Sequence, residues 1–219
     1  DPQNPAGYKL LHDELNKTYV VRPMTPETLS VIPARTSLVV VDGSKALPAR
    51  ALYAIDQFVM KDGKVLFLTD AVEMTEGQGL SVSPVDQDIH QLLKHYGIEI
   101  DSAIVADARN SYAMFNSGYI RFRLPYPLWP KIGADGFDRN IPAVSQLESL
   151  VVPWASPLKT NPPKDVVPNY AALVSSSPQS WIMNEPFDLN PQQDWKVTEA
   201  DLQVSQVGYE VTGPLSSYF

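Results

Sequence analysis

Cysteine is absent from the 219 residues of this chain. Without cysteine the protein forms no disulfide, no thiolate metal site and no cysteine nucleophile. The absence does not assign a compartment, because cytosolic and bacterial periplasmic domains alike are often free of cysteine. Chemistry that depends on a thiol is therefore excluded, whereas chemistry that depends on carboxylates, hydroxyls and aromatic rings stays open.

Positive charge and long apolar runs are also scarce. Lys and Arg number 17 against 25 Asp and Glu, which gives a net charge of -8 and a pI near 4.8. The basic residues are scattered, so we expect no nucleic-acid partner. No apolar run approaches the ~20 residues of a membrane-spanning helix. The chain begins "DPQNPAGY" without an initiating methionine or a visible signal peptide, and we expect it to be a fragment of a longer protein.

Hydrophobic residues make up 44% of the chain and charged residues 19%, as in soluble globular proteins that bury a proper core. Proline is abundant, with 20 residues concentrated beyond residue 124. Because proline fixes φ and cannot donate a backbone hydrogen bond, the second half is expected to hold extended segments and fixed loops more than long helices.

Helical periodicity appears in three segments of the first half. Residues 8–17 place Leu11 and Leu15 on one stripe, and residues 48–63 do the same with Leu52, Ile55 and Val59. A third helix is predicted from about residue 84, with a capping-box spacing at its start and Gly97 at its end. A short strand is also predicted in "TYVVRPM", residues 18–24.

Three apolar runs, residues 36–43, 64–70 and 98–107, are typical of buried strands and alternate with these helices. This order predicts an α/β fold with a doubly wound, mostly parallel sheet. A polar loop, "EMTEGQGLS", is predicted over residues 73–81. After Asp107 the pattern favours a β-hairpin insertion near 110–125 and a β-rich C-terminal part. The simplest organisation is a single domain over residues 1–219.

Two of the predicted strands end on carboxylates, Asp42 and Asp70. The carboxyl ends of parallel strands are where ligands and catalytic groups gather in open α/β sheets. Two carboxylates there could share acid and base duties in a hydrolase, or each could cap its own turn. Ser44 and Lys45 follow Asp42 in "DGSK" and could hold an anion, although a solvated loop lysine is the simpler interpretation.

Cofactor and metal signals are missing from the sequence. His90 and His95 lie five residues apart on a predicted helix and therefore on different faces, and His12 is remote from both. No phosphate-binding glycine loop is present, and Ser175 to Ser177 lack the flanking glycines of a nucleophile elbow. We therefore predict no catalytic residue of these types, no metal site and no cofactor.

The tryptophans stand in Pro-, Ser- or Asn-rich surroundings in the second half: Trp129, Trp154, Trp181 and Trp195. Amphipathic rings of this kind line binding surfaces for sugars, peptides or partner proteins. The alternative is that they fill the space beneath proline-fixed loops. Trp129, Trp154 and Trp181 join Asp42, Ser44, Lys45 and Asp70 as the predicted ligand-binding residues.

The stretch "LVVVDGSKALPARALYAIDQFVMKDGKVLFLTDAVEM" resembles the gliding-motility-type ABC transporter auxiliary components, the GldG-like family. The resemblance continues through "DIHQLLKHYGIEIDSAIVAD", "YPLWP", "LVVPWASPL", "ALVSSSPQSW" and "YEVTGPLSSYF", and so covers nearly the whole chain. The segment "YAIDQFV" is the most specific part. Asp62 replaces the first glycine of the usual pair, and Ala71 replaces the proline that usually follows Asp70, so the local loop shape departs from the family pattern.

The resemblance implies a periplasmic or otherwise extracytoplasmic domain of an inner-membrane protein, working beside an ABC permease and ATPase. It also implies a fold similar to flavodoxin-like and class I glutamine amidotransferase-like sheets. Amidotransferase chemistry is impossible here because it needs a cysteine. Three hypotheses follow. The first is a non-enzymatic binding or scaffolding domain, contacting an oligosaccharide, a lipid-linked ligand or another subunit. The second is a carbohydrate- or ester-acting hydrolase that uses Asp42 and Asp70, and the third is a structural spacer.

Overall fold

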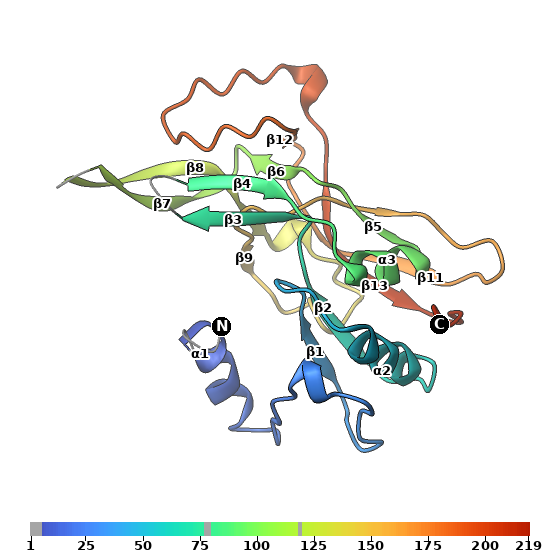
Figure 1. Cartoon of the computed structure of the whole chain (residues 1–219). Coiled ribbons are helices and arrows are strands. Elements are labelled where there is room, and N and C mark those ends of the chain that lie inside the picture. The colour runs from blue at the N-terminus through green and yellow to red at the C-terminus, as the bar shows by residue number, and fades with distance from the viewer. Residues whose placement is uncertain (1–5, 77–79, 118–119) are drawn as a thin grey trace.

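The computed structural model describes residues 6–76, 80–117 and 120–219. The helices α1, α2 and α3 span Ala6–Leu15, Ala49–Val59 and Asp88–His95, and the 3-10 turns η1, η2 and η3 span Pro26–Thr28, Ala134–Gly136 and Glu199–Asp201. Figure 1 shows the helices in the lower part of the molecule and the longer strands above them. Among the described residues, no helix combines the length and the apolar character needed to cross a bilayer.

The helix-bearing part is organised around two parallel strands, β1 (Val39–Asp42) and β2 (Val65–Leu68). The register pairs Val39 with Val65 and Asp42 with Leu68. Side chains of β1 alternate between the two faces, so Val39 and Val41 are buried whereas Val40 is exposed. The helix α2 connects the two strands, as the sequence predicts.

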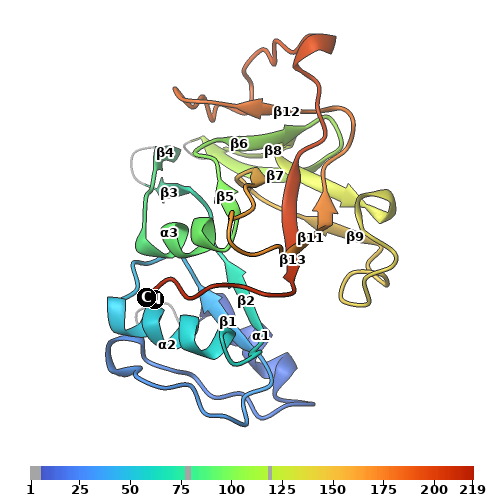
Figure 2. The same cartoon turned by 90° about the vertical axis from the view of Figure 1, so that its right-hand side faces the viewer.

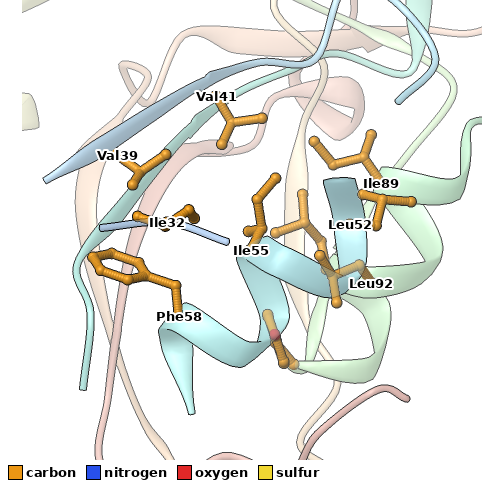
Figure 3. Packing of buried hydrophobic residues seen from close by; sticks show 10 residues of the cluster. Ile32, Val39, Val41, Leu52, Ile55, Phe58, Ile89 and Leu92 are labelled. Carbon is orange, nitrogen blue, oxygen red and sulfur yellow. The ribbon is translucent and has the colours of Figure 1, made fainter. Parts of the chain in front are cut away.

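Helices α2 and α3 cover one face of this strand pair with aliphatic side chains. Leu52 and Ile55 of α2, and Ile89 and Leu92 of α3, recur at helical spacing and are almost fully buried. Figure 3 shows Val39 and Val41 directed towards these helical side chains. The buried cluster consists of Ile32, Val39, Val41, Leu52, Ile55, Phe58, Ile89, Leu92, Leu93 and Tyr96.

The C-terminal residues are fastened to the helices by a buried carboxylate. Asp56 of α2 is fully buried and accepts hydrogen bonds from the Tyr96 hydroxyl at 2.7 Å, the Ser217 hydroxyl at 2.6 Å and the Tyr218 amide at 2.9 Å. Leu215 packs against the same hydrophobic cluster. The last residues of the chain therefore run back across α2 and α3, as Figure 2 shows.

The β-rich part is antiparallel. One sheet has the order β11 (Asn169–Ser175), β13 (Gln206–Thr212), β10 (Leu158–Thr160) and β5 (Ile98–Ile100), and β6 (Ile104–Asp107) pairs with β12 (Ser180–Met183). Two hairpins project to the same side in Figure 1: β3 (Val72–Glu76) with β4 (Leu80–Pro84), and β7 (Asn110–Ser117) with β8 (Ile120–Gly133). Strand β9 (Ser149–Val151) pairs with the far end of β8.

A second hydrophobic cluster lies between these hairpins and β6. Its buried members are Val72, Ile104, Ala106, Ala113, Tyr126, Leu128 and Leu189, and all four tryptophans pack against it. A third cluster, of Ile132, Phe137, Ile141, Val144 and Val174, lies near η2. Unlike the aliphatic cluster around α2, the second cluster is rich in aromatic rings.

The prediction of a doubly wound, mostly parallel sheet of flavodoxin-like or amidotransferase-like type is wrong. Among the described strands only β1 and β2 pair in parallel. The predicted strand 98–107 is interrupted from Asp101 to Ala103, and its halves β5 and β6 each pair with antiparallel partners from the C-terminal part. A buried apolar run looks the same in either kind of sheet, so the sequence pattern could not reveal the pairing.

Other expectations need smaller corrections. The segment 73–81, predicted as a polar loop, belongs to the β3–β4 hairpin, although residues 77–79 lie outside the described part of the chain. Helix α3 begins at Asp88, after Gln87 as its N-cap, because Ser83 belongs to β4. Residues 18–24 are not a strand. The hairpin near 110–125 is confirmed, and β8 extends it to Gly133; Gly118 of its predicted turn lies outside the described residues.

Candidate functional site

The carboxyl ends of β1 and β2 lie side by side, as the sequence predicts for two parallel strands. Asp42 is the last residue of β1, and Asp70 follows the end of β2 by two residues. Between them, Gly43 and Thr69 touch: a Cβ atom added to Gly43 would lie 2.4 Å from the Cβ of Thr69. The absence of a side chain at residue 43 therefore lets the two strand ends approach each other.

The loop after β1 is held by Asp42 itself. The carboxylate of Asp42 accepts a hydrogen bond of 2.9 Å from the amide of Ser44, which is a common way for aspartate to fix a turn. Ser44 and Lys45 are exposed, and Lys45 forms no ion pair with any of the described residues. The predicted residues Asp42, Ser44 and Lys45 therefore form one accessible polar loop.

Asp70 is held by a loop from the second half of the chain. Its carboxylate accepts a hydrogen bond of 3.0 Å from the amide of Ser156, and the Ser156 hydroxyl accepts one of 3.1 Å from the amide of Ala71. Although Asp70 as a whole residue is exposed, its carboxyl lies against the loop of Ser156 and is partly desolvated. This desolvation raises the pKa of Asp70, and the Ser156 hydrogen bond and the charge of His90 offset it only in part.

His90 lies behind the two strand ends, on α3. The amide of Gln87 is 3.3 Å from Nδ1, and because an amide can only donate, Nδ1 accepts and the neutral ring carries its proton on Nε2. Nε2 lies 3.2 Å from the Thr69 hydroxyl, which donates to the Gly43 carbonyl at 3.4 Å. Desolvation lowers the pKa of His90, against the opposing effect of the Asp86 and Asp70 charges, which favours the neutral ring.

The direction of the hydrogen bonds between His90, Thr69 and Gly43 determines whether the Thr69 hydroxyl can be activated. A hydroxyl nucleophile needs a neighbouring base with a free lone pair to take its proton. Here Nε2–H of His90 donates to Thr69, and the Thr69 proton points to the Gly43 carbonyl. The arrangement has the members of a hydroxyl and histidine pair but the wrong tautomer for general-base catalysis.

A polar cavity of about 360 Å³ opens beside His90, between α3 and β5. Among the side chains that line it, Lys94 forms an ion pair of 3.0 Å with Glu99, and Asp101 pairs with Lys159 at 2.5 Å. The remaining lining residues are Ala71, Val85, Asp86, Gln91, Ile100 and Ser102. No three His, Asp or Glu side chains in the described part of the chain converge as ligands for a metal.

The predicted tryptophans gather elsewhere, around the fully buried Tyr126. Trp129 and Trp154 meet edge to face with ring centroids 5.3 Å apart, and both contact Tyr126 at about 6.5 Å. Trp181 packs edge to face on Trp195, which in turn contacts Tyr126. The structure thus brings the three predicted tryptophans together, but in the second hydrophobic cluster and not around Asp42 and Asp70.

The interior of this aromatic cluster contains unpaired polar atoms. The indole Nε1 atoms of Trp129 and Trp154 are enclosed and have no hydrogen-bond partner among the described residues. Burial raises the pKa of the Tyr126 hydroxyl, and the nearby Trp154 indole partly offsets this without reaching hydrogen-bond geometry. The Tyr126 hydroxyl donates instead to the Leu189 carbonyl at 3.0 Å.

One loop connects the aromatic cluster with the strand ends. Trp154 has a φ of 52°, in the left-handed region that non-glycine residues seldom occupy, and its amide donates to the Leu128 carbonyl at 2.8 Å. Two residues later, Ser156 holds Asp70. The packing of Trp154 therefore helps to position Ser156, which donates to the carboxylate of Asp70.

Sequence reasoning missed Thr69, His90 and Ser156 as members of the site. Ser156 lies 86 residues from Asp70 in the chain, so no local pattern connects them. His90 has a signal in retrospect, because it sits between the buried Ile89 and the buried Leu92 on the inward side of α3. Thr69 is adjacent to Asp70 and could have been included with it.

Comparison with known proteins gives the family. The sequence model of a family described as an ABC-type uncharacterized transport system matches residues 4–219. An uncharacterized protein from Borreliella burgdorferi (strain ATCC 35210 / DSM 4680 / CIP 102532 / B31) is 24% identical over 144 residues. That alignment covers 66% of this chain and 28% of the relative, so the matched region is well under half of the relative's length.

Proposed function

Because the chain belongs to the auxiliary family of ABC-type uncharacterized transport systems, we propose that it is a non-enzymatic binding and scaffolding domain of such a system, related to the GldG-like gliding-motility components. In this proposal the domain lies on the extracytoplasmic side of the inner membrane, and its partners are the permease and ATPase subunits of the same system. The GldG-like resemblance of "YAIDQFV" and the family match support this assignment.

The observation that carries the non-enzymatic assignment is the direction of hydrogen bonding at the strand ends. Asp42 is engaged by Ser44, Asp70 by Ser156, and His90 donates its Nε2 proton towards Thr69. For His90 to act as a general base towards Thr69, its Nε2 would have to accept the hydroxyl proton and not donate its own. We infer that these groups offer hydrogen bonds to a ligand and do not activate a nucleophile.

Within this proposal the ligand contacts are Asp42, Ser44, Lys45 and Asp70. The mixture of a free ammonium group and carboxylates suits a hydroxyl-rich ligand such as an oligosaccharide or the head group of a lipid-linked sugar, because such ligands need both donors and acceptors. Trp129, Trp154 and Trp181 contribute by holding the loop that presents Ser156 to Asp70.

Association with the transporter is tested by purifying the full-length membrane form with a mild detergent and identifying its stoichiometric partners by mass spectrometry. We expect an ABC permease and its ATPase. Recovery of the membrane form alone, under conditions in which the permease and ATPase remain bound to each other, would contradict the scaffolding role.

Binding without turnover is tested on an oligosaccharide array, with the mass of each retained ligand measured afterwards. We expect intact ligand, retained more weakly by Lys45→Ala and Asp70→Asn, and unchanged retention by Lys164→Ala, which removes an exposed lysine from a distant loop. Hydrolysed ligand, with turnover abolished by Asp70→Asn, would instead establish the hydrolase that uses Asp42 and Asp70.

A further inference from the structure

One face of the β1–β2 pair has no cover among the described residues. Helices α2 and α3 pack on the side of Val39 and Val41, but Val40, Leu66 and Leu68 on the other side are 41%, 45% and 39% exposed. Leu38, which precedes β1, is 51% exposed. Val40 is the register partner of Leu66, so these side chains form one continuous apolar patch. Parallel strands are ordinarily covered on both faces, so this patch, the open face, is unusual.

The helix α1 has an apolar side that could pack against the open face. Leu11 and Leu15 are four residues apart and share one side of the helix, and Leu11 is 42% exposed. The other side bears the ion pair between Lys9 and Asp13, at 2.5 Å. A helix of ten residues is marginal in water unless its apolar side packs against something.

The position of α1 places it opposite the open face. Figures 1 and 2 agree that α1 lies on the side of the β1–β2 pair away from α2. The connection allows movement: residues 16–25 are nearly all exposed, and their hydrogen bonds among the described residues are local. Extended, ten residues span on the order of 30 Å. After α1, the first residues that pack against the aliphatic cluster are Leu29 and Ile32.

We propose that α1 is a hinged cover that docks its Leu11 and Leu15 side onto the open face, against Val40, Leu66 and Leu68. Docking would bury apolar surface on both partners, and it would leave the antiparallel, β-rich architecture unchanged. Asp42 continues the exposed alternation of β1, so a docked α1 would also lie next to the candidate ligand-binding loop. The cover would thereby control access to Asp42.

Docking of α1 can be tested by disulfide cross-linking, because engineered cysteines meet no native cysteine in this protein. The pair Leu11→Cys with Leu66→Cys should form an intramolecular disulfide under mild oxidation, at least about tenfold faster than the control pair Asp13→Cys with Leu66→Cys, whose first cysteine faces away. Equal rates, or no intramolecular product from either pair, would overturn the proposal. A disulfide that forms between two chains, at a rate that falls as the protein is diluted before oxidation, would overturn the intramolecular cover and mean that α1 of a second copy covers the face.

Hydrogen exchange provides a second measurement that needs no cross-link. If α1 docks, its amides should exchange several-fold faster in Leu66→Glu than in the unaltered protein. The control Val167→Glu adds the same charge at a residue that is 85% exposed in the β-rich part, and it should leave the exchange of α1 unchanged. Exchange of α1 at the same rate in all three proteins would contradict the docked cover, even if both variants fold normally.

Discussion

At the carboxyl ends of β1 and β2, polar side chains are exposed and paired with backbone amides, whereas around Tyr126 the indole N–H groups of two tryptophans are enclosed without partners. The proposed ligand contacts at the strand ends are therefore accessible while α1 is undocked. The indole N–H groups of Trp129 and Trp154 could not donate to a ligand without rearrangement, although the rings themselves are partly exposed. The two regions are connected by the loop that joins Trp154, packed on Tyr126, to Ser156, which donates to Asp70.

The largest effect is expected from removing the centre of the aromatic cluster. Tyr126→Ala would leave a cavity among Phe115, Trp129, Trp154 and Trp195 and should lower the free energy of unfolding by about 3–5 kcal/mol, measured by urea denaturation. Tyr112→Ala serves as the control, because Tyr112 is 51% exposed and should cost under about 1 kcal/mol. Similar losses from both variants would show that the cluster is not a structural core and would remove the contrast with the strand ends.

The helix-bearing part depends in a comparable way on Asp56. Asp56→Ala would leave the Tyr96 hydroxyl, the Ser217 hydroxyl and the Tyr218 amide without their acceptor, and we expect a loss of about 2–3 kcal/mol. Asp165→Ala, at an exposed loop position, should have little effect. If Asp56→Ala were equally harmless, the C-terminal residues would not be fastened to α2 through this carboxylate.

Acid should weaken this anchor before it affects the aromatic cluster. Desolvation acts to raise the pKa of Asp56, but the hydrogen bonds from Ser217, Tyr218, Tyr96 and Gln57 outweigh it, and the pKa is lowered from 3.8. The stabilisation is therefore fully present above 3.8 and is lost as the pH falls through the lower folded-state value. The difference between Asp56→Ala and the unaltered protein should shrink over that acidic range.

The parts of the fold that sequence reasoning predicts correctly are those with local patterns. The stripe of Leu52 and Ile55 identifies α2 to within a few residues, and the apolar runs before Asp42 and Asp70 identify β1 and β2. The antiparallel pairings were inaccessible because they join distant segments, such as β5 with β10 and β6 with β12. The pattern of buried residues does not encode which distant strand is the partner.

In the candidate site, too, the sequence predicts what depends on local patterns and misses what depends on contacts between distant segments. The adjacency of Asp42 and Asp70 follows from two neighbouring parallel strands, and the sequence predicts it. The contact of Ser156 with Asp70 depends on how the loop after β9 packs, and that packing is set by Trp154 against Tyr126. The assignment of Trp154 as a ligand contact stays a prediction. Its neighbours in the chain could not reveal that its indole N–H is enclosed.

A smaller effect is expected where the two strand ends touch. Gly43→Ala would place a Cβ 2.4 Å from the Thr69 Cβ, so the strand ends would have to separate, at a cost of about 1–3 kcal/mol. Gly208→Ala is the matched control, because its Cβ would meet Val174 no closer than 3.1 Å and should be tolerated better. Urea denaturation of both variants measures the difference. Equal tolerance at the two positions would mean that the strand ends are already loose and do not form a preorganised site.

The smallest effect on stability is expected at Asp70. Its sign should be opposite to that at Asp56, because the pKa of Asp70 is raised whereas the pKa of Asp56 is lowered. Burial raises the pKa of Asp70, so its ionised form carries a penalty that is fully present above the folded-state pKa and absent below 3.8. Asp70→Asn keeps an acceptor for the Ser156 amide and removes that penalty. Because Asp70 as a whole residue is exposed and solvent screens part of the effect, we expect a gain of only a few tenths of a kcal/mol near neutral pH, vanishing in acid, as measured by urea denaturation. A loss of more than about 1 kcal/mol at neutral pH would instead make Asp70 a charged anchor like Asp56, and the strand ends would then be a structural joint and not an open site.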